Sequence, residues 1–353
     1  MQYLGMDVHA TATVWCLVDA QGEVLREGQV RTTPAALTAL VQALSQAGEV
    51  LAGQEVGTLT SLVHDAVTAA GTTLLSFNAQ HLRMIAASRK KTDRRDAYWI
   101  AKALQSGMSP HPVYIPTGEI RELRALLSQR RVLHTDYTRW RHRARTYLRA
   151  GGYPVALGVA ALRAALAPGS AGTRGAPPSL LDALALCQRQ EAALRAELAQ
   201  LDATLRARTQ TVDAIQRLMT VPGIGPLTAT MLYAWVGDVR RFPHAKQLAA
   251  YAGLVPTVRQ SGSTVQLGHI TKRGAPALRA TVVQAAHVLL SRCRGREATP
   301  LQAIGLRIRG RRGRRKIAVV AVARHLVRIA FYILRDGTTY DAGRLGETMH
   351  SAA

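Results

Sequence analysis

A chain of 353 residues with 48% hydrophobic residues is long enough for two or three folded domains, which excludes wholesale disorder. Its 46 lysines and arginines against 22 acidic residues give a formal net charge of +24, which predicts a polyanionic partner bound through release of phosphate counterions. The sequence shows neither a secretory signal nor a paired-cysteine motif, so we expect a cytoplasmic protein.

The first third of the chain predicts an α/β domain. Residues 2–31 contain three short apolar runs separated by turn residues, which is typical of an antiparallel meander. A helix over 33–46, a strand over 50–56, a helix over 59–70 and a strand over 72–78 follow. With a further helix that begins near residue 92, the order is βββαβαβα. This is the order of the ribonuclease-H fold.

Four acidic residues stand at the ends of these predicted elements. Asp7 closes the first strand and Glu55 closes the strand over 50–56, while Asp93 and Asp96 lie three apart at the start of the last helix. Carboxylates from strand ends and from one helical face can converge on one or two hard cations, such as Mg²⁺. Each residue alone could equally be a turn acceptor, a surface charge or a helix cap. Together, their order and spacing favour a metal site.

From about residue 116 the pattern becomes helical and basic. One long helix has an apolar stripe and arginine-rich remaining faces. A Gly/Ala/Pro-rich interval over 151–178 predicts a loose connection, and a second long helix carries a nearly heptad seam from Leu180 to Ile215. The seam fits an antiparallel hairpin within one chain and a dimerising coiled coil equally well.

A glycine turn, VPGIGP, separates two apolar helical segments after residue 217. Its Gly223 and Gly225 predict a helix-hairpin-helix turn, in which the following helix offers backbone N–H groups to a phosphate. The alternative is an ordinary glycine turn. The strongly basic chain favours the phosphate-binding version.

The segment 259–274, RQSGSTVQLGHITKRG, predicts a polar loop between two helices. A serine hydroxyl, Ser261 or Ser263, could attack a phosphodiester if cations stabilise the developing charge. Lys272, Arg273 and Arg279 could supply that charge. By these residues alone an ordinary loop is favoured, because serine and glycine are common loop residues.

A basic cluster, RIRGRRGRRK over 307–316, precedes the last predicted helix. It contains Arg311, Arg312, Arg314 and Arg315 and no acidic residue, which favours contact with phosphate or RNA over a merely solvated charge run. The apolar stretch 317–334 is interrupted by two arginines and a histidine, so we expect no membrane span.

These segments together resemble the DEDD-type insertion-sequence transposases, the IS-one-ten family that also includes the pilin-inversion recombinase Piv. The resemblance covers nearly the whole chain. The similar segments occur in family order: GMDVH, GQEVGTLTSLV, KKTDRRDAYWIAKAL, VPGIGPLTATML, FPHAKQLAAYAGLVP, RQSGSTVQLGHITKRGAPALR and RRKIAVVAVARHLVRIAFYILRDG.

The resemblance implies three parts. A RuvC-like domain would occupy residues 1–112, a helical coiled-coil region 113–215, and a mainly helical transposase domain 216–345. The four carboxylates would be the DEDD residues that bind Mg²⁺. The nucleophile would be a serine that maps onto Ser261, with Ser263 as the alternative register.

The resemblance also implies a mechanism and partners. DNA would be cleaved, exchanged and religated through a phosphoserine intermediate. The partners would be donor and target DNA, a structured noncoding bridge RNA, and further copies of the chain, with dimers assembling into tetramers that share composite sites. Two alternatives are a RuvC-like nuclease that hydrolyses DNA with water, and a basic nucleic-acid-binding protein with an inactive acidic site.

Overall fold

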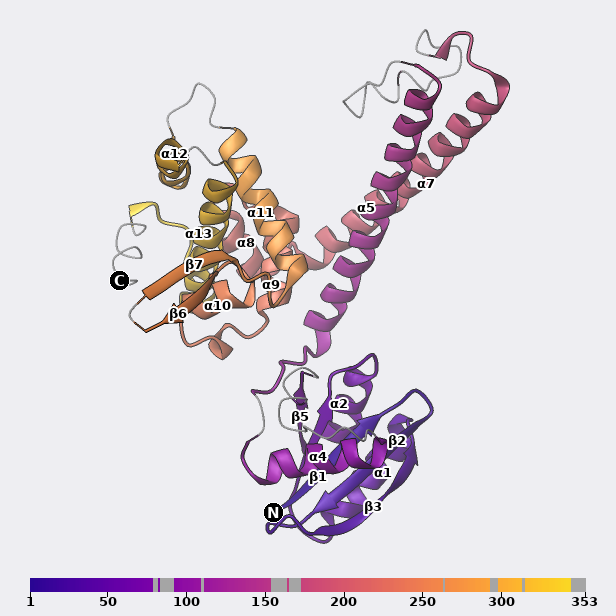
Figure 1. The fold of residues 1–353 in the computed structure, drawn as a ribbon, viewed down its shortest axis with the longest axis vertical. Helices are drawn as coiled ribbons and strands as arrows, with labels where there is room; N and C mark the ends of the chain where they lie inside the picture. Colours follow the sequence, from indigo (N-terminus) through magenta and orange to yellow (C-terminus); the bar gives the residue numbers. More distant parts are fainter. Residues whose placement is uncertain are drawn as a thin grey trace. The chain divides into compact units, whose positions relative to one another are not determined.

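The computed structural model describes residues 1–78, 82, 92–108, 111–153, 164, 173–262, 264–292, 298–312 and 315–343. The chain divides into two compact units, Met1–Thr117 and Gly118–Ala353. Figure 1 shows a mixed α/β N-terminal unit and a mostly helical C-terminal unit. A separate domain over residues 113–215 stays a prediction.

The N-terminal unit contains a five-stranded sheet with the strand order β3-β2-β1-β4-β5. Strands β1 (Gln2–Val8), β2 (Ala12–Val18) and β3 (Val24–Arg31) form an antiparallel meander. Strand β4 (Val50–Glu55) pairs in parallel with β1, and β5 (Thr73–Phe77) pairs in parallel with β4. Parallel neighbours need crossover connections, which helices provide here. The predicted order βββαβαβα is confirmed.

Different helices cover the two faces of this sheet. Helices α1 (Pro34–Ser45) and α2 (Thr60–Ala69) pack against the face that carries Leu4 and Met6 of β1. Helix α4 (Asp93–Gln105) covers the opposite face. Because successive side chains of a strand alternate between faces, the face under α4 belongs to the odd-numbered residues of β1.

Two paired glycines allow α4 to lie directly on the strands. Gly5 of β1 is the partner of Gly53 of β4. A Cβ atom at Gly5 would lie only 1.9 Å from the carbonyl oxygen of Ala97 in α4, and one at Gly53 would lie 2.8 Å from the side chain of Leu104. The backbone of α4 therefore rests against the backbone of β1, at a distance that no side chain at residue 5 would permit.

The C-terminal unit begins with two long antiparallel helices, α5 (Gly118–Ala150) and α7 (Pro178–Thr209), which lie side by side in Figure 1. Arg130 of α5 forms a two-pronged ion pair with Asp202 of α7, with N–O distances of 2.5 and 3.1 Å. Leu148 and Leu184 share a small hydrophobic cluster nearer the other end. The two helices thus form the antiparallel hairpin within one chain, which was one of the two alternatives that the sequence left open. Association between chains stays a prediction.

The predicted seam from Leu180 to Ile215 is wrong at its end. Helix α7 stops at Thr209, and Ile215 belongs to a separate short helix, α8 (Asp213–Met219). The Thr209 hydroxyl bonds back to the Leu205 carbonyl, and Val212 has extended backbone angles. Heptad spacing cannot reveal such a break, because the hydrophobic residues before and after it are buried whether or not the helix is continuous.

Helices α8, α10, α11 and α12 pack against α13 (Arg315–Asp336), which is long and apolar enough to cross a membrane by length and composition. However, 56% of its apolar window is buried, and it supplies much of the C-terminal core. A core helix explains that burial. The elements after α8 are α9 (Pro226–Val236), the 3-10 turn η2 (Val239–Arg241), α10 (Ala245–Tyr251), β6 (Pro256–Ser261), β7 (Thr264–Ile270), α11 (Pro276–Ser291), α12 (Pro300–Arg312) and α13.

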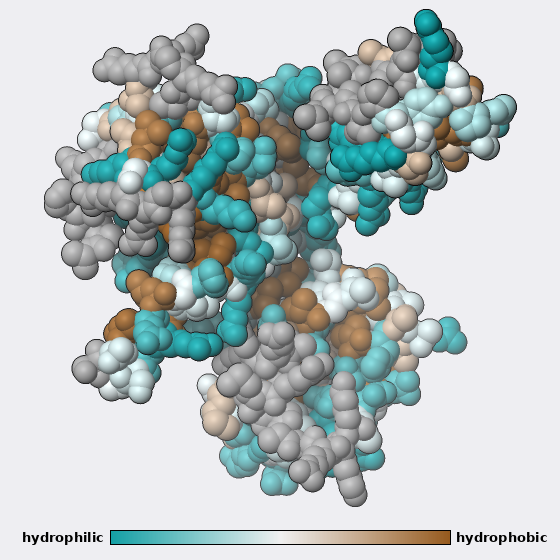
Figure 2. Space-filling model, turned by 45° about the horizontal axis from the view of Figure 1, so that its top comes forward, coloured by the Kyte–Doolittle hydropathy of each residue, from teal (hydrophilic) through white to brown (hydrophobic). Residues whose placement is uncertain are grey.

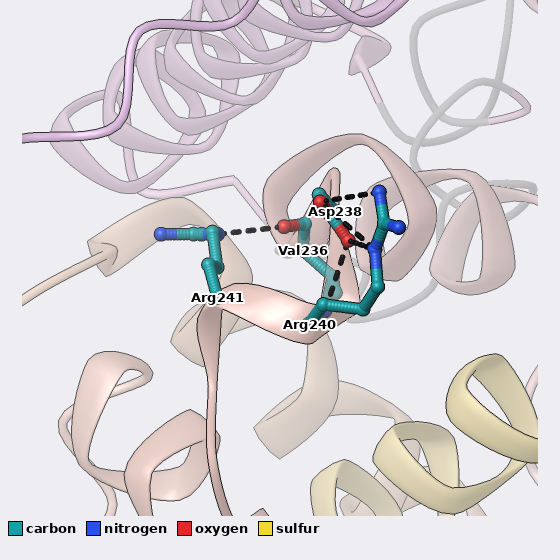
Figure 3. Close-up of polar contacts among 4 residues, drawn as sticks. All are labelled: Val236, Asp238, Arg240 and Arg241. Atoms are coloured by element: carbon teal, nitrogen blue, oxygen red, sulfur yellow. Dashed lines mark hydrogen bonds and ion pairs between the residues drawn. The ribbon is translucent and has the colours of Figure 1, made fainter.

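Two arginines close the C-terminal end of α9. Arg241 donates to the carbonyl of Val236 at 2.9 Å (Figure 3). It also donates to the carbonyl of Trp235 at 3.0 Å. Arg124 of α5 donates to the carbonyls of Ala234 at 2.8 Å and Trp235 at 3.1 Å. The last carbonyls of a helix lack intrahelical donors and carry partial negative charge, so guanidinium groups satisfy both needs. These contacts fix α5 against α9.

The turn that joins α9 to η2 is held by an ion pair of its own, between Asp238 and Arg240. Figure 3 shows Arg240 on the other side of the turn from Arg241, bonded to Asp238 through its side chain at 3.0 Å and its backbone N–H at 2.9 Å. The side-chain hydrogen bond from Arg240 holds the pKa of Asp238 below its usual range. Gly237, at φ +56°, provides the left-handed conformation that starts this turn.

The contact at Gly5 yields a testable prediction. Gly5→Ala should lower the free energy of unfolding by about 1–3 kcal/mol, because the added Cβ must push the backbone of α4 away from β1. Chemical denaturation of the purified protein measures this. Gly57→Ala is the control, since a Cβ at Gly57 would meet no atom within 4 Å. Equal stability of the two variants would contradict the close packing.

Candidate metal centre and nucleic-acid contacts

Carboxylates of β1 and α4 converge at one end of the sheet. Asp7 lies near the end of β1 with 18% of its side chain exposed, and Asp93 begins α4. His9 lies between them, with its Nε2 atom 3.1 Å from Asp7 Oδ2 and 3.4 Å from Asp93 Oδ2. One ligand atom of each of these three residues lies within 4.8 Å of the others. This spacing is compatible with a shared cation.

The start of α4 is built to hold its acidic residues in place. Thr92 caps the helix, because its hydroxyl accepts from the Arg95 N–H at 3.4 Å and its carbonyl accepts from the Asp96 N–H at 2.9 Å. Asp93 and Asp96 then occupy the first turn, where the helix dipole favours negative charge. Arg94 is directed to Glu27 of β3, with which it forms an ion pair.

The surroundings of the Asp7 carboxylate raise its pKa. Burial raises its pKa, and the nearby charges of Asp96 and Asp93 raise it further, while the His9 contact lowers it. Asp96 therefore acts on the same carboxylate as Asp93. A hard cation would offset the repulsion that Asp93 and Asp96 exert on Asp7.

Glu55 lies at the margin of this cluster. It is the exposed last residue of β4. Because Met6 is paired with Gln54, the next positions on the two strands put Asp7 and Glu55 on neighbouring strands, on the face under α4. Glu55 is nevertheless absent from the set of ligand atoms within 4.8 Å of one another. The structure thus brings Asp7, His9 and Asp93 together and places the charge of Asp96 near Asp7, while Asp96 and Glu55 both lie outside the 4.8 Å set.

His9 is a site residue that our sequence interpretation missed. The signal was available, because the period of two places residues 7 and 9 of the same extended segment on one face. A histidine two positions from a candidate ligand therefore merits consideration whenever the ligand closes a strand.

The segment around Ser261 is a two-stranded ribbon, so the predicted polar loop is wrong. Strands β6 and β7 pair antiparallel, with Ser261 opposite Thr264 at the tip. Gly262, at φ +57°, supplies the positive φ that such a tight turn needs. Ser261 is exposed, while Ser263 lies outside the described residues. Most positions of the ribbon are polar, so the sequence shows no clear alternation of apolar and polar residues that would predict strands.

The basic residues proposed to assist Ser261 lie at the base of the ribbon instead. Lys272 follows β7, and its backbone N–H donates to the Gly253 carbonyl at 3.3 Å, with Arg273 beside it. Arg279 in α11 donates to the Ala252 carbonyl at 3.2 Å. The ribbon's base is about 16 Å from its tip, at roughly 3.3 Å per residue. The structure does not bring these cations together with Ser261.

The glycine turn that we predicted to bind phosphate connects α8 to α9, and its binding of phosphate stays a prediction. Gly223 has φ +90°, and Gly225 precedes Pro226, the first residue of α9. Both glycines line a cleft of about 710 Å³ whose other walls come from α5 and α11. The remaining N–H groups of the first turn, at Leu227 and Thr228, also line it.

The basic cluster over 307–316 spans the junction of α12 and α13. Arg315 begins α13, and its side chain lies 3.4 Å from His287 Nε2. Arg311 and Arg312 end α12, but their side chains lie outside the described part, as does all of Arg314. Figure 2 shows long hydrophilic side chains across hydrophobic surface of the C-terminal unit. Such a mixture suits contact with phosphates and with the less polar sugars and bases between them.

Comparison with known proteins adds one structural neighbour of low similarity. Thermus thermophilus RuvC is 15% identical to this chain, with a TM-score of 0.26, and the match covers 32% of this chain and 100% of that one. A TM-score this low does not establish a shared fold. The N-terminal unit is assigned to the ribonuclease-H fold from its own strand order instead.

Sequence relatives are more informative. A probable family 20 transposase from Pseudomonas aeruginosa is 36% identical over 42% of this chain, which spans 44% of that relative. A pilin gene-inverting protein of Moraxella lacunata is 32% identical over 35% of this chain and 38% of its own length. The transposase for insertion sequence element IS1111A from Coxiella burnetii is 32% identical over 75% of this chain and 72% of its own length.

Two family models match the chain. Residues 4–151 match an IS110-type DEDD model described as Transposase, and residues 215–301 match the model described as Transposase IS116/IS110/IS902 family. The two matches contain the candidate metal centre and the Ser261 ribbon respectively. Together with the extended similarity to the Coxiella burnetii transposase, they show that this chain belongs to the IS110 family of insertion-sequence transposases.

Proposed function

We propose that this protein is a DNA recombinase that moves an insertion sequence, and that its N-terminal carboxylates support DNA strand cleavage with Mg²⁺. The observation that carries the proposal is the convergence of Asp7, His9 and Asp93 within 4.8 Å, with Asp96 acting on the same carboxylate. Membership of a transposase family and the net charge of +24 support DNA as the substrate.

The donor set fits a hard divalent cation. Asp7, Asp93 and Asp96 offer carboxylate oxygens from two rigid elements, and oxygen is the ligand that Mg²⁺ prefers. We propose that Glu55, from the neighbouring position on β4, completes the set. His9 is assigned a positioning role, because its hydrogen bond at 3.1 Å orients Asp7 and imidazole is a poorer ligand for Mg²⁺. A bound cation would stabilise negative charge on the phosphodiester undergoing cleavage.

Ser261 is the proposed nucleophile. Its exposed position at the ribbon tip gives a DNA backbone free approach. The serine oxygen would form a bond to phosphorus while the bond from phosphorus to the leaving sugar oxygen breaks, and the serine proton would pass to a base. Attack by a sugar hydroxyl on the phosphoserine reverses the exchange, so religation needs no nucleotide energy source.

The source of activation for Ser261 is part of the proposal. A free serine hydroxyl is a poor nucleophile, and β6 and β7 contain no aspartate or glutamate. We infer that a carboxylate site of another subunit assists, within dimers that assemble into tetramers. Guidance by a structured bridge RNA, paired with donor and target DNA, is inferred from the family resemblance. The alternative, a hydrolytic nuclease, would use the same carboxylates without Ser261.

The carboxylate proposal predicts a loss of cleavage without a loss of folding. Asp7→Asn, Asp93→Asn, Asp96→Asn and Glu55→Gln should each lower Mg²⁺-dependent nicking of supercoiled plasmid by on the order of 100-fold. Because its raised pKa shows that ionised Asp7 is disfavoured in the fold, Asp7→Asn should leave the metal-free protein as stable as wild type at pH 7, or more stable.

The control for that experiment is Glu49→Gln, which removes an exposed carboxylate immediately before the opposite end of β4. It should nick plasmid at the wild-type rate. Wild-type cleavage by Asp96→Asn would remove Asp96 from the site, and wild-type cleavage by all four variants would refute the proposal.

The serine proposal predicts a covalent protein–DNA species on denaturing gels. Wild type and Ser263→Ala should form it, and Ser261→Ala should not. Mixing Ser261→Ala with Asp7→Asn should restore some cleavage, because one subunit then supplies the serine and another the carboxylates. An adduct that persists in Ser261→Ala and vanishes in Ser263→Ala would move the nucleophile by two residues. Cleavage without any adduct would favour the hydrolytic nuclease.

A further inference from the structure

A cleft of about 710 Å³ lies between α5, the α8–α9 turn and α11. We propose that it holds the sugar-phosphate backbone of a nucleic-acid strand, on lining residues that belong neither to the carboxylate cluster nor to the Ser261 ribbon. The proposal rests on the protein's proposed action on nucleic acid. It assigns binding residues on α5 and α11 that neither the motif nor the family resemblance indicated.

The charges along the cleft have one sign. Among the described residues, its charged lining residues are Arg130, Arg131 and Arg292, with no aspartate or glutamate. Arg130 is neutralised by Asp202. Arg131 and Arg292 are exposed, and within the described residues no ion pair joins either one to an acid. The cleft therefore presents uncompensated positive charge from two walls, one on α5 and one at the end of α11.

A histidine on the α5 wall, His134, adds little to the positive charge of the cleft. Burial lowers the pKa of His134, and the charges of Arg130 and Arg141 lower it further, while Asp202 raises it. The imidazole is therefore neutral at pH 7, when it can both donate and accept a hydrogen bond. The positive charge of the cleft comes from its arginines.

The lining between the arginines is apolar with a few hydrogen-bonding groups. Leu127, Ile224 and Met231 are buried at the cleft, and Thr228 and Gln284 offer polar atoms. A nucleic-acid strand matches this mixture, with phosphates for the arginines and less polar sugars and bases for the rest. An apolar helix would fit the lining but would cover Arg131 and Arg292 without supplying a negative partner, which is costly.

Gly225 gives independent support. Gly223 is explained by the chain itself, because its φ is +90° and a Cβ would lie 3.1 Å from Leu289. Gly225 is not: its φ of −93° and ψ of 179° suit any residue, and a Cβ would meet no atom within 4 Å. Within the described residues no contact and no backbone angle require glycine at 225, where serine, threonine, asparagine or aspartate would cap α9 at least as well. Its missing side chain leaves the backbone open to the cleft, as close approach of a strand requires.

The test measures binding by full-length protein to labelled single-stranded DNA and RNA of one sequence, by fluorescence anisotropy over a salt series. The double variant Arg131→Gln/Arg292→Gln should bind more weakly. Its slope of log affinity against log salt should fall by about 1.4, since each phosphate contact on a single strand contributes about 0.7. The stronger of the DNA and RNA responses identifies which strand occupies the cleft.

Two further variants separate a cleft from general charge. Arg189→Gln/Arg195→Gln removes the same charge from exposed positions on α7 outside the cleft, so it should reduce binding much less. Gly225→Ala leaves charge unchanged and should lower the melting temperature by no more than the few degrees expected of a weaker helix cap, while binding at least several-fold more weakly. Equal weakening by the two arginine pairs, or wild-type binding by Gly225→Ala, would overturn the proposal.

Other outcomes also decide between occupants. A change in mass by light scattering in the cleft variants, with strand affinity intact, would assign the cleft to a second copy of the chain. Asp7→Asn should bind as wild type without cleaving. If wild type never cleaves but the cleft variants lose affinity as expected, the proposed function fails and the cleft stands. If wild type cleaves and the cleft variants bind normally, the cleft alone fails.

Discussion

The candidate metal centre depends on the contact between the backbone of α4 and that of β1 at Gly5. A Cβ at this position would lie 1.9 Å from the Ala97 carbonyl oxygen, and the paired Gly53 lacks a Cβ on the neighbouring strand. The helix thus approaches the sheet closely, and its first turn comes down beside the end of β1. Asp93 meets Asp7 there because Gly5 lies two residues earlier, on the same face of the strand.

The surroundings of Asp7 disfavour its ionised form. Burial and two neighbouring carboxylates raise the pKa of Asp7. Only the His9 contact offsets this among the influences on Asp7. Arg94, at the same helix end, pairs with Glu27 of β3. Local rules are commonly broken at functional sites, where a ligand supplies the missing compensation.

The N-terminal unit could be predicted from the sequence because its elements have strong apolar periods and acidic residues at their ends. Asp7 and Asp93 accordingly lie together, with the charge of Asp96 near Asp7. Three features could not be predicted, each for a physical reason. The ribbon at Ser261 is polar and exposed, so no burial pattern marks it. The break after Thr209 leaves hydrophobic spacing intact. The partner of α5 is set by ion pairs such as Arg130 with Asp202, which lie 72 positions apart.

The most direct measurement of the central claim is anomalous diffraction from crystals of the full-length protein soaked in Mn²⁺ as a substitute for Mg²⁺. We expect a peak at the end of β1, bound by carboxylate oxygens of Asp7 and Asp93 at about 2.0–2.2 Å. His9 should remain hydrogen-bonded to Asp7. A map with no peak there, from crystals in which Asp7 and Asp93 keep their positions, would contradict a metal-dependent site in this unit.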